Sequence, residues 1–177
     1  MGHLGVEMRR WKTIAALLAA LPGAASASAG ERTALGIFRD WGAFREGPAD
    51  APDRCFAIAE PPPGTRSAGR GAFASVASWP TKRIRAQLAI RLSHDHRDGA
   101  PVTLSIGDGS FALVTQGRDA WARDRGTDAA IVAAMRSGSS MSISSVTPQG
   151  LPFADGYRLR GAASAIDSAL LGCPIGR

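Results

Sequence analysis

Short runs of alternating apolar and polar residues recur along the chain from residue 35 onward. The clearest run is 84–92, where Leu88 and Ile90 lie on one face of the predicted strand and Arg85 and Arg91 on the other. Period-two alternation puts one face in a core and the other in water. This is typical of an antiparallel sheet with one solvated side. Further strands are predicted at residues 35–41, 53–59, 72–79, 101–106, 110–115, 120–123, 141–146 and 157–160.

Turn and loop signals separate these runs. Gly107-Asp108-Gly109 predicts a tight hairpin, because glycine adopts the positive backbone angles that such a turn needs. Residues 60–71 contain three consecutive prolines, which cannot donate to a strand ladder, and are predicted to be a loop. Residues 147–156 are predicted to be a second loop.

Two short segments have helical rather than strand periodicity. Thr127-Asp128 predicts a helix start, with an apolar stripe at Ile131 and Met135 and a stop at Gly138. Residues 162–171 predict a second short helix. Many short strands with two short helices indicate a mostly β protein, a single antiparallel β-sandwich or compact barrel.

The first 29 residues are predicted to be a cleaved signal peptide. A cationic stretch at residues 8–12 precedes an uncharged apolar run at 13–21, and small residues at 25–29 offer two cleavage sites. The apolar run is too short to span a bilayer, which takes about 20 residues. Translation starts at Met1 or Met8. We therefore expect one domain at residues 30–177, without a transmembrane segment, in the periplasm, on the cell surface or in the medium of a Gram-negative bacterium.

The number of cysteines and the net charge indicate a disulfide and the kinds of partner that the protein can bind. The chain has two cysteines, Cys55 and Cys173, and an even count in an oxidising compartment predicts a disulfide. Closing so long a loop would add about 4 to 5 kcal/mol of stability; two free buried thiols are the alternative. The net charge of +6 is almost entirely arginine. The positive charge has two interpretations, a solvated surface or an attraction to anionic envelope polymers or lipids. Nucleic acid is disfavoured by the compartment and by the lack of a basic stripe interleaved with aromatics.

No reactive centre is evident in the residue pattern. His94 and His96 flank an aspartate and are weak candidates for a zinc or copper site, but the cluster precedes a turn signal and is interpreted as a solvated turn. A serine-hydrolase elbow is lacking. The aromatics Trp41, Trp79, Trp121 and Tyr157 are expected in the core or at the sandwich edge, whereas an exposed pair of them would indicate a sugar or peptide platform. We predict no catalytic residue, no cofactor and no metal.

Several segments, taken in order, resemble the invasion-associated locus B family of proteobacterial envelope proteins. The resemblance runs from residue 41 to 173 and rests on Asp40-Trp41, on Cys55-Phe56-Ala57, on the helix end at 131–138, on Gly150 and on residues 157–161. The chain departs from the family in Ala162, where an aromatic is common, and in having only two cysteines. The resemblance implies a periplasmic or surface-exposed, non-catalytic domain and supplies no active site.

Three functional hypotheses follow. The first is an exported envelope protein that binds an unidentified envelope or host-surface partner through Arg85, Arg91 and Arg158. The second is a periplasmic hydrolase that uses His94 or His96 with a carboxylate. The third is a secreted enzyme inhibitor that presents residues 61–71 as a rigid loop.

Overall fold

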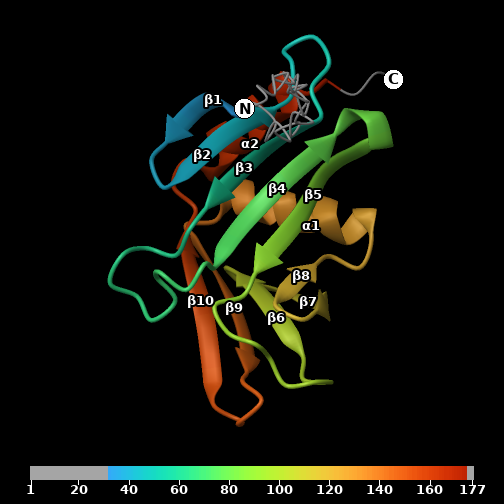
Figure 1. Cartoon of the computed structure of the whole chain (residues 1–177). Helices are drawn as coiled ribbons and strands as arrows, with labels where there is room; N and C mark the ends of the chain where they lie inside the picture. Colours follow the sequence, from blue (N-terminus) through green and yellow to red (C-terminus); the bar gives the residue numbers. More distant parts are fainter. Residues whose placement is uncertain (1–31, 175–177) are drawn as a thin grey trace, which may run out of the picture.

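The structure, a computed structural model, describes residues 32–174; the predicted signal peptide lies outside these residues. Ten strands, one short 3-10 helix (Pro80–Lys82) and two α-helices follow one another (Figure 1). In chain order the strands and helices are β1 (Arg32–Phe38), β2 (Trp41–Glu46), β3 (Arg54–Ala59), β4 (Phe73–Trp79), β5 (Ile84–Arg91), β6 (Val102–Ile106), β7 (Gly109–Gln116), β8 (Asp119–Trp121), α1 (Arg125–Ser137), β9 (Ser140–Val146), β10 (Pro152–Arg158) and α2 (Ala162–Gly172).

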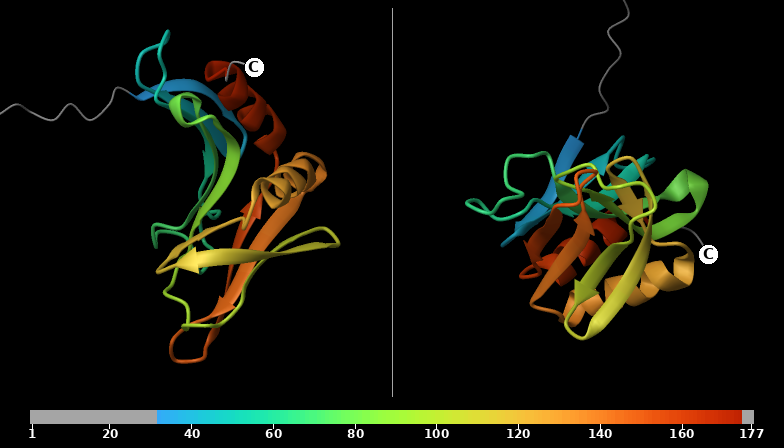
Figure 2. Two further views of the ribbon diagram at one scale, coloured as in Figure 1. Left: turned by 90° about the vertical axis from the view of Figure 1, so that its right-hand side faces the viewer. Right: turned by 90° about the horizontal axis from the view of Figure 1, so that it is seen from below.

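All ten strands form one antiparallel sheet in the order β1-β2-β3-β4-β5-β8-β7-β6-β9-β10. The sheet bends at its middle, so that β1–β5 and β6–β10 form two arms set at an angle (Figure 2). It stays open, because β1 and β10 are its two ends. The predicted class, mostly β with two short helices, is confirmed, and of the two architectures the open, folded sheet excludes the closed barrel.

Both helices cover the same side of this bent sheet. α2 contacts β1 to β4, α1 contacts β5, β6 and β7, and the two helices touch each other. Arg136 of α1 forms an ion pair with Asp167 of α2 at 2.7 Å. The alternation predicted for β5 is confirmed, since Leu88 and Ile90 are almost fully buried. None of the helices within residues 32–174 is long and apolar enough to cross a bilayer.

Three local predictions were wrong. The run at 35–41 is two strands, because Arg39, at φ 60°, reverses the chain there. Non-glycine residues rarely adopt positive φ, so the sequence carries no turn signal. α1 starts earlier than predicted, since Asp124 caps it by accepting from the Thr127 amide at 2.7 Å. The end of the predicted 147–156 loop belongs to β10, an edge strand that begins with Pro152.

The two ends of the open sheet meet without forming a ladder, at a place we call the sheet-end junction (Phe38, Asp40, Trp41, Arg158 and Gly161). The Trp41 indole Nε1 donates to the Arg158 carbonyl at 2.8 Å. Asp40 carries an ion pair with Arg158 at 3.9 Å. Gly161 adopts φ 89°, and its Cα lies directly against the Phe38 carbonyl. The junction holds the β1–β2 turn against the end of β10.

A disulfide joins Cys55 in β3 to Cys173, the residue after α2. The Cα atoms are 5.6 Å apart and the cysteines are separated by 118 residues in sequence. Both are fully buried. The bridge therefore ties α2 to the sheet that it covers, as predicted from the cysteine count.

Asp128 joins α1 to β5, and its carboxylate accepts from the Leu88 amide at 2.8 Å. Burial raises the pKa of Asp128; the Leu88 bond offsets part of this rise and the negative charge of Asp124 adds to it. We expect Asp128→Ala to lower the free energy of unfolding by about 2 kcal/mol, because the buried amide loses its partner. Asp128→Asn keeps an acceptor and should cost less.

Because the pKa of Asp128 is raised, the stability difference between wild type and Asp128→Asn should depend on pH. The folded state takes up the proton of Asp128 at a higher pH than the unfolded state does, so acid relieves the cost of burying the charge. Wild type should therefore gain stability relative to Asp128→Asn as the pH falls from 7 to about 4, near the ordinary aspartate pKa. Urea denaturation at both pH values measures the difference. An unchanged difference would show that the carboxylate is not penalised by burial.

Candidate functional site

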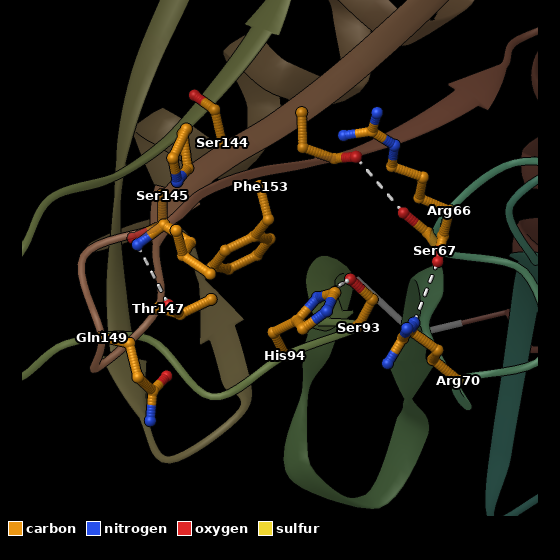
Figure 3. Close-up of a pocket in the computed structure, with 13 residues that line it drawn as sticks. Arg66, Ser67, Arg70, Ser93, His94, Ser144, Ser145, Thr147, Gln149 and Phe153 are labelled. Atoms are coloured by element: carbon orange, nitrogen blue, oxygen red, sulfur yellow. Dashed lines mark hydrogen bonds between the residues drawn. The ribbon is translucent and has the colours of Figure 1, made fainter.

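An open pocket of about 790 Å³ lies where the β3–β4 loop, the end of β5 and the β9–β10 hairpin meet. Figure 3 shows His94 and Phe153 in its middle, Arg66 and Arg70 on one side, and Thr147 on the other. The remaining lining residues are Ser67, Ser93, Ser144, Ser145, Gln149, Leu151, Pro152 and Ala154. The volume lies in the range of small-molecule sites, about 300 to 1,000 Å³.

Asp155 lies behind the pocket floor and is fully buried. Its Oδ1 accepts from the Ser67 hydroxyl at 2.6 Å and from the Ser93 hydroxyl. Its Oδ2 accepts from the Ser93 amide at 2.8 Å. Within residues 32–174 it forms no ion pair. Buried charge requires such compensation, so three donors from two segments hold this carboxylate.

Strand alternation places Asp155 inside. Phe153, Asp155 and Tyr157 share the inward face of β10, and Asp155 stands opposite Ile143 of β9. Ser67 reaches this face from the β3–β4 loop, and its hydroxyl oxygen also lies 3.2 Å from the Ala154 carbonyl oxygen, so that the two acceptors share its one proton. The loop is therefore anchored at its centre, while its neighbours Arg66 and Arg70 stay exposed.

His94 is held at the pocket floor by two contacts. Its Nδ1 lies 2.8 Å from the Ser93 hydroxyl oxygen, and its ring centroid lies 5.2 Å from that of Phe153. A carboxylate only accepts, so the Ser93 proton points to Asp155 and His94 donates Nδ1–H to Ser93. Nε2 is left without a partner from Ser93 and is the ring nitrogen that a ligand can reach.

The chain His94–Ser93–Asp155 has the reverse order of a hydrolase triad. In such a triad the histidine stands between hydroxyl and carboxylate and takes the hydroxyl proton. Here Ser93 stands in the middle, is only 5% exposed, and directs its proton to the carboxylate. The arrangement fixes a ring and a loop, and does not activate Ser93 as a nucleophile.

Tyr157 lies beyond Asp155 on the same face and is buried. Burial raises its pKa, and the negative charges of Asp155 and Glu60 raise it further. Its hydroxyl has no hydrogen-bond partner in the part of the chain that the structure describes. The side chain thus stays neutral and acts as core, as predicted for this aromatic.

We expect Asp155→Ala to lower the free energy of unfolding by about 3 kcal/mol, because a buried amide and two hydroxyls lose their acceptor. Asp155→Asn keeps one acceptor oxygen, so its free energy of unfolding should lie between those of Asp155→Ala and wild type. Urea denaturation gives the values. Asp95→Ala, at an exposed position two residues from Ser93, is the control and should change little. Equal stability of Asp155→Ala and the control would rule out this role.

The structure gives His94 and His96 different partners. His94 faces the pocket, whereas the His96 Nε2 lies 3.1 Å from the Thr115 hydroxyl of β7. Within the described residues, no three histidine, cysteine or acidic side chains gather closely enough to hold a metal. The segment is not the fully solvated turn that we predicted, since both rings are half-buried.

The three arginines chosen from the sequence do not share one surface. Arg91 faces Asp119 at 2.7 Å, and Arg158 lies in the sheet-end junction beside Asp40. Arg85 is exposed and forms no ion pair within residues 32–174. It borders a smaller hollow of about 330 Å³ over α1, together with Arg125 and Asp128.

Sequence reasoning missed the pocket itself. Arg66, Ser67 and Arg70 lay in a predicted loop that was considered only as the exposed loop of an enzyme inhibitor, and Asp155 lay in a second predicted loop. Asp155 carried one usable signal, because it alternates with Phe153 and Tyr157, but Pro152 and Gly156 in the same run disfavour a strand.

Comparison with known proteins assigns the chain to a protein family. The family model "Invasion associated locus B (IalB) protein" matches residues 41–170. The chain belongs to this family. The resemblance inferred from its sequence is thereby confirmed. Invasion associated locus B proteins are associated with the bacterial envelope and are not known as enzymes.

A solved structure agrees at the level of fold. The chain is similar to the crystal structure of invasion associated protein B from Bartonella henselae, with 15% identity and a TM-score of 0.52. The similarity covers 77% of this chain and 95% of that one. Comparison with curated proteins finds no match.

Some of the residues that carried the resemblance to invasion associated locus B proteins meet at the sheet-end junction. Asp40 and Trp41 meet Arg158 there, and Gly161 approaches Phe38. Cys55 is in the disulfide. These residues thus hold the fold together, and the pocket is built by others.

Proposed function

We propose that this invasion associated locus B protein is an exported, non-catalytic binding domain of the Gram-negative envelope. One observation carries the proposal: the pocket has a floor whose polar groups satisfy each other, and a wall whose two arginines form no ion pair within residues 32–174. Such a site is prepared to receive a ligand rather than to activate a nucleophile. The N-terminal signal pattern and the Cys55–Cys173 bridge support export, because disulfides persist in oxidising compartments.

Export is tested by fractionation of cells that make the full chain. We expect the protein in the periplasm or on the surface, with an N-terminus at Ser28 or Gly30 by mass spectrometry. Protease treatment of intact cells then separates the two locations, since only surface protein is degraded. Full-length protein in the cytosol, with both thiols open to alkylation, would refute export.

The non-catalytic part has its own test. A hydrolase that uses His94 as a base would lose turnover in His94→Ala. We expect no hydrolysis of ester, phosphate or glycoside chromogenic substrates above a blank, and no difference between wild type and this variant. Turnover that disappears with His94 would refute this part of the proposal.

An anionic envelope partner is also part of the proposal. Of the three arginines selected from the sequence, Arg85 is the one that forms no ion pair within the described residues. We expect Arg85→Glu to weaken salt-sensitive binding to purified envelope fragments. Arg39→Glu, an exposed turn position, is the control. Equal binding by both variants would remove Arg85 from the contact surface.

A further inference from the structure

The pocket walls are cationic. Arg66 and Arg70 are exposed, and neither has a carboxylate partner within residues 32–174. None of the lining residues is an aspartate or a glutamate. The carboxylate oxygens of the buried Asp155 accept from three donors behind the pocket floor, and Asp155 does not line the pocket. An anionic group is therefore the ligand feature that this side of the pocket favours.

The floor has a different character. Phe153 and His94 are half-buried rings inclined at 41° to each other, and together they form an apolar surface. Opposite the arginines stand Thr147 and Gln149, whose hydroxyl and amide groups donate and accept hydrogen bonds (Figure 3). A saccharide combines the complementary features, because its C–H face packs on rings while its hydroxyls require donors and acceptors.

The arginine wall is held in place before any ligand arrives. Ser67, between the two arginines, is fixed to Asp155 and to the Ala154 carbonyl. Arg118 donates to the Arg70 carbonyl at 2.8 Å, which fixes the far end of the loop. A backbone fixed in advance lowers the entropic cost of binding.

We propose that the pocket binds a saccharide that carries a carboxylate, with the sugar ring on Phe153 and His94 and the carboxylate between Arg66 and Arg70. This inference rests on the proposed binding function and names its ligand class. A free anion lacks the ring that the floor accepts, and a neutral sugar lacks the charge that the wall accepts. Asp155 is a positioning residue in this site, since it fixes the loop and does not reach the ligand.

A matched pair of disaccharides tests the proposal by calorimetric titration of the processed protein. The acidic probe joins N-acetylglucosamine to N-acetylmuramic acid, and the neutral probe is diacetylchitobiose, which has the same ring framework without the carboxylate. Inorganic phosphate is the third probe. We expect the acidic disaccharide to bind at least about tenfold more tightly than the neutral one, which corresponds to about 1.4 kcal/mol, and phosphate to bind more weakly than either.

Variants separate the two parts of the site. Arg66→Gln with Arg70→Gln should remove the preference for the acidic disaccharide, whereas Arg123→Gln, an exposed arginine before α1, should leave it unchanged. Phe153→Leu should weaken both disaccharides together. Circular dichroism verifies that each variant is folded.

The outcomes that overturn the inference are distinct. Equal affinity for the two disaccharides, or tighter binding of phosphate, would refute the acidic saccharide. If neither disaccharide binds, the ligand is not a saccharide. Neither result affects export or the absence of turnover, which the fractionation and the His94→Ala assay decide separately.

Discussion

Gly161→Ala is expected to lower the free energy of unfolding by more than about 4 kcal/mol, a loss in the range reserved for severe packing defects. A Cβ at this position would overlap the Phe38 carbonyl oxygen and would also approach the Phe38 Cβ at 3.1 Å. The φ of 89° adds backbone strain for any residue with a side chain.

The overlap cannot be relieved by a side-chain rotation, because the obstructing atom belongs to the backbone. Phe38 ends β1, and Asp40, two residues further on, donates its amide to the Arg160 carbonyl at 3.2 Å. Moving either segment would break this bond and separate the Trp41 indole from Arg158. The sheet-end junction would then open, and the two sheet ends would lose their connection.

Two other glycines serve as matched controls. Gly64 has a similar φ of 83° but nothing near its Cβ position, and Gly156 has neither positive φ nor a neighbour. Gly64→Ala therefore measures backbone strain alone, at about 1 to 2 kcal/mol, and Gly156→Ala measures the substitution itself. Urea denaturation of the three variants is the measurement. A Gly161→Ala loss no larger than that of Gly64→Ala would show that the close approach to Phe38 is absent.

Elements with strong local patterns were predictable. The strand β5 was predictable because one of its faces is buried and its residues alternate accordingly. The turn at Gly107-Asp108 between β6 and β7 was predictable because glycine readily adopts positive φ. The end of α1 at Gly138 follows from residues adjacent in sequence. The fold class followed from these pieces because short strands with few helices leave few ways to bury a core.

The pocket could not be derived in the same way, because its parts are distant in sequence. Ser67 and Asp155 are 88 residues apart, and Ser93 and Asp155 are 62 apart. A serine in a polar loop and an aspartate beside a glycine look like solvent-exposed residues until the sheet brings them together. His94 was noticed for its chemistry, but its partner Phe153 comes from the far edge strand.

This contrast explains why the family resemblance did not reveal the site. Trp41 and Gly161, which carried part of it, lie where the two ends of the open sheet contact each other. Any chain with this topology needs contacts at that place. The arginines of the pocket lie on a loop anchored by one serine, and a loop can change its side chains without changing the anchor. The residues that join the sheet ends and the arginines that line the pocket are thus separate sets.

Removal of the disulfide, as Cys55→Ala with Cys173→Ala, is expected to lower the free energy of unfolding by about 5 kcal/mol. The bridge closes a segment of 118 residues, and the chain-entropy model gives this value for a loop of that length. Domains of this kind are stable by only about 5 to 15 kcal/mol, so the loss would be a large share of the total. Alanine keeps the buried positions apolar.

The loss of stability should be greatest in α2, because the disulfide attaches this helix to β3. Hydrogen exchange should therefore speed up in α2 before the rest of the domain. Reductant should destabilise wild type and leave the double variant unchanged, which separates loss of the bond from loss of sulfur volume. If reductant leaves wild type unaffected, or if alkylation reaches both thiols without it, the bond does not form. The proposed export would then lose one of its two supports, because disulfides persist in oxidising compartments, and only the N-terminal signal pattern would still favour it.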